Sequence, residues 1–126
     1  MKPALLIATI ALAGCAAPQP ASPSQRQAAE LVGRAAGAAQ NCIPIERGEA
    51  LRVADGGDGH VLLYGRGTMI WASSLGPGCG FSHSDVLITE SHDGRYCRGD
   101  FVRSTDGLSN IPGQTCVLGE FVPYAR

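Results

Sequence analysis

The sequence predicts a small all-β domain, a barrel or sandwich of about six to seven short strands stapled by disulfides. Three observations support this fold class. Short apolar runs alternate with glycine-rich segments, and glycine accounts for 17 of the 126 residues. After residue 40, no long stretch shows the 3.6-residue periodicity of an amphipathic helix. The chain has five cysteines, and the four that follow residue 40 are widely spaced and even in number, as a disulfide framework requires.

The first element in chain order is a predicted signal peptide over residues 1–14. Lys2 supplies the positive charge at its start, and an apolar run follows over residues 4–13. This run is far shorter than the ~20 apolar residues that a membrane-spanning helix needs, so we expect it to be cleaved rather than to span the bilayer.

The apolar run ends in the letters LAGC at residues 12–15, which resemble the lipobox of Gram-negative lipoprotein precursors. The resemblance implies that the mature chain begins at Cys15 and carries acyl chains there. Several chains make a stable anchor, so the lipid bilayer is an expected partner. Ala16 replaces the aspartate that retains such proteins at the inner membrane. We therefore expect a lipid-anchored protein on the periplasmic side of the cell envelope, with the outer membrane favoured.

Residues 15–40 are expected to link the anchor to the domain. The part up to residue 25 is rich in proline, alanine and serine, which is typical of a semi-extended tether. Residues 26–40 are rich in alanine and could form a marginal helix, which Ser22 or Ser24 would cap. Two glycines within it weaken such a helix by ~1 kcal/mol each.

The folded domain is expected over residues 41–126. Its strands are predicted, in order, at residues 42–46, 50–54, 60–65, 69–75, 85–91, 96–104 and 116–124. The DGGDG segment at 55–59 and the segment 105–115 are predicted loops. Asp93 and Gly94 match a two-residue type I′ turn, which makes 85–104 the clearest predicted hairpin.

The cysteines after the lipobox are expected to form two disulfides in an oxidising compartment. In the predicted hairpin, His92 faces Arg95, Glu90 faces Cys97 and His83 faces Ser104. Cys79 then lies at the end of the sheet away from the turn, where the last strand is also expected to begin. This favours the pairs Cys79–Cys116 and Cys42–Cys97 among the three possible connectivities.

Several groups of polar residues have the composition of a functional site. Five of them, which lie within eleven residues, are zinc-ligand types: His83, Asp85, Glu90, His92 and Asp93. They occupy opposite ends of the predicted hairpin, too far apart for one metal, so no metal site is predicted. The DGGDG loop lacks the full spacing of a calcium loop. No GxSxG, GxGxxG or Walker motif occurs, so we predict no catalytic residue and no cofactor.

The charge of the chain disfavours nucleic-acid binding. Lys2 is the only lysine among 10 basic residues, and the other nine are arginines set against 11 carboxylates. No basic stripe exists that could follow phosphates along a duplex. Trp71 is expected in the core or lining a barrel. Glu120 is expected either to alternate outward while Phe121 packs inward, or to pair with an arginine such as Arg98 or Arg103. Pro123 is expected to mark a strand end or an edge.

The letters CRGD at residues 97–100 and TCVLGEFVPY at 115–124 resemble a family of small exported Gram-negative proteins catalogued only as a domain of unknown function. Residues 42–43 and 75–79 also fit that family's pattern of four spaced cysteines. The resemblance spans residues 41–124. It implies export, frequent lipid anchoring and no established activity, and it assigns no catalytic residue.

Together these features predict a non-enzymatic envelope lipoprotein whose domain binds or supports another periplasmic component. One alternative is an inhibitor-type β-barrel, similar in scale to the periplasmic lysozyme inhibitors, although their C-terminal inhibitory motif is missing. A protruding loop with an exposed polar tip, such as residues 105–115, would favour it. A further alternative is a small-ligand-binding or hydrolytic barrel, which would require a concave pocket.

Overall fold

A computed structural model describes residues 22–109 and 111–126 of the chain. Over these residues the chain forms nine strands and two short helical segments, which confirms the predicted all-β class. The predicted signal peptide and Cys15 lie outside the described residues. In the described part, no helix has the length and apolarity needed to cross a bilayer.

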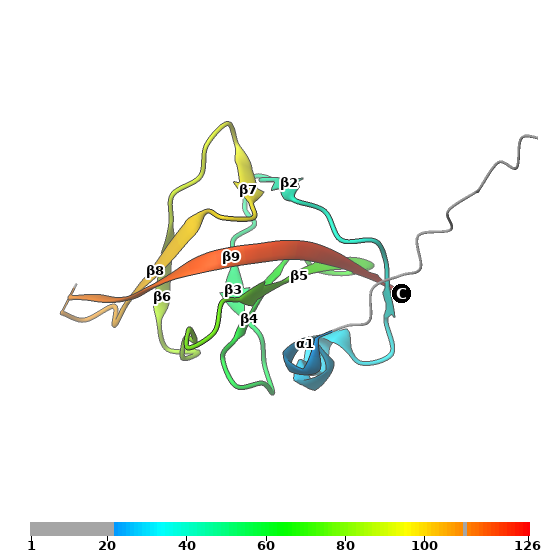
Figure 1. Ribbon diagram of the computed structural model, residues 1–126, viewed down its shortest axis with the longest axis horizontal. Coiled ribbons are helices and arrows are strands. Elements are labelled where there is room, and N and C mark those ends of the chain that lie inside the picture. Colours follow the sequence, from blue (N-terminus) through cyan, green and yellow to red (C-terminus); the bar gives the residue numbers. More distant parts are fainter. Residues whose placement is uncertain (1–21, 110) are drawn as a thin grey trace, which may run out of the picture.

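One antiparallel, barrel-like sheet forms most of the domain (Figure 1). Its strands lie in the order β3, β4, β5, β9, β8 and β6, while β1 pairs with the end of β9 and a separate ribbon joins β2 to β7. The strands are β1 (Ala35–Ala36), β2 (Cys42–Pro44), β3 (Arg52–Val53), β4 (Val61–Tyr64), β5 (Met69–Leu75), β6 (Val86–Thr89), β7 (Arg95–Cys97), β8 (Phe101–Thr105) and β9 (Pro112–Ala125). The helical segments are α1 (Pro23–Gln27) and a 3₁₀ turn, η1 (Ala29–Leu31).

The long strand β9 holds the two halves of the sheet together. Its first half pairs with β8 and its second half with β5, and the register on β5 shifts between Ser73 and Leu75. Gly119 lies at this change of partner, where a Cβ would collide with the carbonyl oxygen of Ser74. A glycine is therefore needed for β9 to approach β5 closely.

Buried side chains form two clusters on opposite faces of β4. Alternate residues of β4 enter different clusters, so this strand is buried on both faces. The larger cluster includes Ile43, Leu62, Tyr64, Tyr96, Val102, Leu118 and Phe121. The smaller consists of Ala28, Leu31, Ala54, Val61, Leu63, Ile70, Ala72 and Tyr124. The second cluster explains why the segment that contains α1 and η1 packs on the sheet.

The structure contains both expected disulfides, Cys42–Cys97 and Cys79–Cys116. The first joins directly opposed residues of β2 and β7, and the second ties the loop before Phe81 to β9. The bridges span sequence separations of 55 and 37 residues. On the chain-entropy estimate each stabilises the fold by about 4 kcal/mol.

The predicted hairpin over residues 85–104 is correct at its turn and wrong in its register. Asp93 and Gly94 have φ angles of 58° and 67°, as a type I′ turn requires, and His92 does face Arg95. Beyond this pair, β7 leaves the hairpin to pair with β2, and a tight turn at residues 98–100 separates it from β8. Ser104 consequently faces Leu87 rather than His83, and the amide of Glu90 donates to Phe101 instead of lying opposite Cys97.

The expected linker and helix over residues 26–40 are also corrected. The helix is only one turn long, covers Pro23–Gln27 instead of residues 26–40, and is capped by Ser22, one of the two predicted capping serines. Residues 22–40 pack on the domain rather than forming a tether. The predicted loop 105–115 is shorter, because β9 begins at Pro112. Pro123 lies inside β9 rather than at its end, and its carbonyl accepts from Gly37 on the side of the two-residue strand β1. The proline nitrogen, which has no N–H to donate, therefore faces β1, whose pairing with β9 covers only two residues.

Candidate functional site

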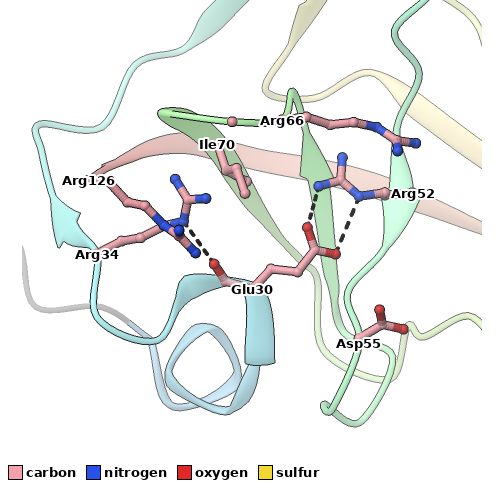
Figure 2. A pocket seen from close by; sticks show the side chains of 8 residues that line it. Glu30, Arg34, Arg52, Asp55, Arg66, Ile70 and Arg126 are labelled. Carbon is pink, nitrogen blue, oxygen red and sulfur yellow. Dashed lines mark hydrogen bonds and ion pairs between the residues drawn. The ribbon is translucent and has the colours of Figure 1, made fainter.

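A pocket of about 490 Å³ lined by four of the nine arginines opens beside η1 (Figure 2). Its walls come from η1, the residue before β1, β3, the turn between β4 and β5, and the residue that follows β9. The lining residues are Glu30, Arg34, Arg52, Asp55, Arg66, Gly67, Ile70 and Arg126. The pocket thus depends on the N-terminal segment, whose packing on the sheet positions Glu30 and Arg34.

One of the arginines is fully engaged by the protein. Arg52 donates from Nη2 to Oε2 of Glu30 at 2.6 Å and from Nε to Oε1 at 3.4 Å, and its Nη1 donates to the carbonyl of Gly65 at 2.9 Å. The Arg52 and Glu30 side chains keep 23% and 30% of their surface exposed. Because Glu30 turns its carboxylate toward Arg52, its charge is directed away from Arg34 and Arg126 (Figure 2).

The other three arginines have no carboxylate partner within the described residues. Arg34 donates from Nε to the carbonyl of Glu30 at 2.9 Å, which fixes its guanidinium at the pocket wall. Its Nη1 is buried and has no hydrogen-bond partner among the residues described. Arg126 is held by its backbone amide, which donates to Thr68. A buried donor without an acceptor is costly, so Arg34 is the lining residue of this pocket whose hydrogen bonding is left incomplete within the described residues.

The chemistry of this pocket is that of anion recognition. Counting side chains alone, four guanidiniums against the carboxylates of Glu30 and Asp55 give a formal charge of about +2. Guanidinium groups stay protonated and present planar forks of donors that match carboxylate and phosphate oxygens. Ile70, which is buried, adds an apolar wall to an otherwise polar pocket.

A second hollow of about 320 Å³ adjoins the first and shares Glu30, Arg52 and Asp55 with it. It is also lined by residues just before and within β6. The strands β3 and β6 are the two ends of the sheet and are not paired with each other, so this hollow lies in the gap between them. There His83 Nδ1 lies 3.4 Å from the carboxylate of Asp55, and both side chains are exposed. The open edge of the barrel-like sheet and the arginine pocket therefore form a continuous concave surface.

The residues singled out as zinc-ligand types do not come together. His83 contacts Asp55, whereas His92 and Asp93 lie at the exposed turn of the hairpin. Glu90 pairs with Arg103 at 2.7 Å. No group of three or more potential metal ligands is found within residues 22–109 and 111–126.

The remaining candidate residues have structural roles. Glu120 pairs with Arg98 at 3.0 Å, which is one of its two expected outcomes, but the side chains of Arg98 and Glu120 are 60% and 39% exposed rather than buried. The RGD letters lie in the turn between β7 and β8, not in a strand, and Asp100 accepts from the amide of Cys97. Trp71 is half-buried against the larger core cluster, and the DGGDG segment is an exposed turn between β3 and β4.

Comparison with known proteins gave no matching family model, curated protein or solved structure. The pocket itself was missed by sequence reasoning. Its arginines are scattered along the whole domain, and the only available signal was that nearly all basic residues are arginine, a bias that genome composition also explains.

Proposed function

We propose that this chain is a lipid-anchored, non-enzymatic module of the bacterial envelope that binds an anionic group in its arginine pocket. The observation that carries the proposal is the set of three arginines without carboxylate partners, one of which has a buried donor without an acceptor. Guanidiniums bind and orient anions but do not act as nucleophiles or general bases near neutral pH. The lipobox-like sequence at Cys15 and the two disulfides support an anchored protein in an oxidising compartment.

Anion binding is tested by titration calorimetry of the full chain carrying Cys15→Ser, with inorganic phosphate, pyrophosphate and citrate as probes. We expect saturable binding of at least one probe, with a Kd that rises at least tenfold in Arg34→Gln. The matched control is Arg103→Gln, which removes the same charge from an exposed site outside the pocket. Equal binding by both variants, or no binding by the wild type, would refute the proposal.

Anchoring is tested separately by fractionation of cells that produce the wild type or Cys15→Ser. We expect the wild type in the outer-membrane fraction and the variant in the soluble periplasmic fraction. Labelling the wild type with a fatty-acid analogue should mark the protein only when Cys15 is present. A variant that stays with the membranes and a wild type that takes up no label would contradict lipid anchoring.

A second candidate, binding of an envelope protein, is favoured by an exposed apolar face on β6, β8 and β9. Val86 and Ile88 alternate on β6, and Phe101 lies opposite Val117, so these four side chains share one face of the sheet. They are 42–54% exposed, and the loop that follows β8 adds Leu108 at 95%. A contiguous exposed apolar face of this kind is typical of a protein interaction site.

This second candidate is tested by crosslinking and co-purification from native envelopes. Phe101→Asp should abolish recovery of a stoichiometric partner that the wild type retains, while Arg95→Asp, at an exposed position of β7, should not. Recovery of the same partner with Phe101→Asp would exclude this face as its binding surface.

A further inference from the structure

We infer that the anion held in the arginine pocket is the phosphate group of a phospholipid headgroup, in the membrane that carries the anchor. The inference rests on the proposed function, since it requires both lipid anchoring at Cys15 and anion binding by the pocket. It adds to these the identity of the ligand and the orientation of the domain on the bilayer.

The first observation is that the pocket lies at the end of the domain where the described chain begins. The helix α1 starts one residue after Ser22 and is followed by η1, which carries Glu30. Arg34 lies three residues after the end of η1. Figure 1 shows α1 and the C-terminus toward one end of the long axis, with the tip of the β8–β9 hairpin at the opposite end. The pocket is therefore close to the point at which the tether joins the domain.

The second observation is the shortness of that tether. Six residues lie between Cys15 and Ser22, so the seven steps from one Cα to the next reach at most about 25 Å even when fully extended. A domain of this size has a radius of gyration of about 13 Å and so measures more than 30 Å across. An acylated Cys15 would thus hold the α1 end near the headgroups, while the apolar hairpin on the other side points toward the periplasm.

The third observation is the fit between the pocket and a phosphate. A phosphodiester presents two unbridged oxygens that accept from a planar guanidinium fork, and several forks around one pocket can share them. The buried Nη1 of Arg34 lacks an acceptor, and Arg66 and Arg126 border the same space without a carboxylate partner. Ile70 offers an apolar wall to the glycerol carbons that follow the phosphate in a lipid.

Proximity to the bilayer selects the lipid phosphate over a soluble one. Headgroups held within reach of a short tether present phosphate at an effective concentration far above that of a dilute solute. Arg66 and Arg126, which border the pocket, are exposed. A lipid headgroup can therefore reach them without leaving the membrane surface. Each lipid contact would be weak alone and would fix the orientation of an anchored domain.

The test is vesicle co-sedimentation of the full chain carrying Cys15→Ser, so that no acyl chain contributes to binding. Vesicles contain a neutral glycolipid that carries no phosphate, mixed with either phosphatidylglycerol or oleic acid at matched surface charge. The pocket variant is the pair Arg34→Gln and Arg126→Gln. Its control is the pair Arg98→Gln and Arg103→Gln, which removes the same charge from the exposed ion pairs outside the pocket. Urea unfolding of both variants checks that each is folded, and the single exposed variant Arg66→Gln provides a second pocket probe.

We expect binding to phosphatidylglycerol vesicles that exceeds binding to oleic acid vesicles. Binding to phosphatidylglycerol vesicles should be at least tenfold weaker in the pocket variant and severalfold weaker in Arg66→Gln. In the control variant it should change less than twofold. Soluble glycerol phosphate should compete. Equal binding to both vesicle types, or equal loss in pocket and control variants, would overturn the lipid inference in favour of general surface charge. Calorimetric binding of glycerol phosphate without vesicle binding would overturn it while leaving the proposed anion binding intact. Absence of both would refute the two together.

Discussion

Replacing Glu30 with glutamine separates the two effects of its carboxylate, which holds Arg52 and lowers the positive charge of the pocket. Glu30→Gln keeps the size of the side chain and one acceptor for Arg52 but removes the negative charge. A hydrogen bond between charged groups contributes ~1.5–3 kcal/mol when buried, and an exposed ion pair ~0–1 kcal/mol. With the Arg52 and Glu30 side chains 23% and 30% exposed, we expect the free energy of unfolding to fall by about 1 kcal/mol.

The same substitution should strengthen anion binding. Glu30 lines the same pocket, so its negative charge opposes a bound anion even though the carboxylate is turned toward Arg52. Even at the dielectric constant of water, a unit charge at a separation of about 4 Å costs about 1 kcal/mol, which corresponds to about a fivefold change in Kd. The prediction is therefore lower stability together with tighter binding.

Two measurements check this prediction on the full chain carrying Cys15→Ser. Urea unfolding, followed by the fluorescence of the single tryptophan Trp71, gives the change in stability, and calorimetry with inorganic phosphate gives the change in Kd. Glu120→Gln is the control, because it breaks the exposed Arg98–Glu120 pair and should leave Kd unchanged. Weaker phosphate binding by Glu30→Gln than by the wild type would refute the reasoning, since the carboxylate would then be supporting the site rather than opposing the anion.

Three further predictions concern the stability of the fold. Replacing Cys79 and Cys116 together by alanine should lower the free energy of unfolding by about 4 kcal/mol, and an unchanged urea midpoint would contradict this. Phe121→Ala should cost about 3–5 kcal/mol in the same assay, because the ring is fully buried; a loss below about 1 kcal/mol would contradict its place in the core. Burial raises the pKa of Tyr64 and of Tyr124 above the ordinary value of 10.0, partly offset at Tyr64 by the Glu46 backbone hydrogen bond and at Tyr124 by the charge of Arg26. The stability that these phenols contribute is complete below pH 10.0 and lost as the pH rises through their folded-state values, so their ionisation should accompany alkaline unfolding in an absorbance titration. Ionisation of both at pH 10.0 without unfolding would contradict it.

Local signals in the sequence predicted the parts of the fold that local chemistry determines. The type I′ turn at Asp93 and Gly94 requires positive φ at both residues, and this sequence is one of the few that supply it. The strand at residues 69–75 was predicted with its observed bounds, because this short apolar run lies between the glycine-rich turn segments 65–67 and 76–80.

The register of the hairpin could not be predicted because a distant segment determines it. Residues 95–97 pair with β2, more than 50 residues earlier in the chain, and the Cys42–Cys97 bridge secures that pairing. A pattern within residues 85–104 has no access to this competing partner. The alanine-rich N-terminal segment was predicted as a linker for a similar reason. Ala28 is fully buried in the smaller core cluster, but its small side chain gives no strong apolar signal in the sequence.

The arginine pocket could not be predicted for the same reason. Arg34, Arg52, Arg66 and Arg126 come from separate elements, and only the packing of η1 on β3 and the position of the C-terminal residue bring them together. None of them belongs to a recognisable motif, and each by itself has the composition of an ordinary exposed residue. Only the folded chain shows that three of them share one pocket without a carboxylate partner in the described residues.

The central claim is that this pocket binds an anion, and NMR of the arginine Nε–Hε groups during a titration with inorganic phosphate tests it most directly. We expect the signals of Arg34, Arg66 and Arg126 to shift along one shared saturable curve, while those of Arg98 and Arg103, in their ion pairs outside the pocket, stay nearly constant. Small, unsaturable shifts of equal size at all five arginines would contradict it, because they would show only general screening of charge.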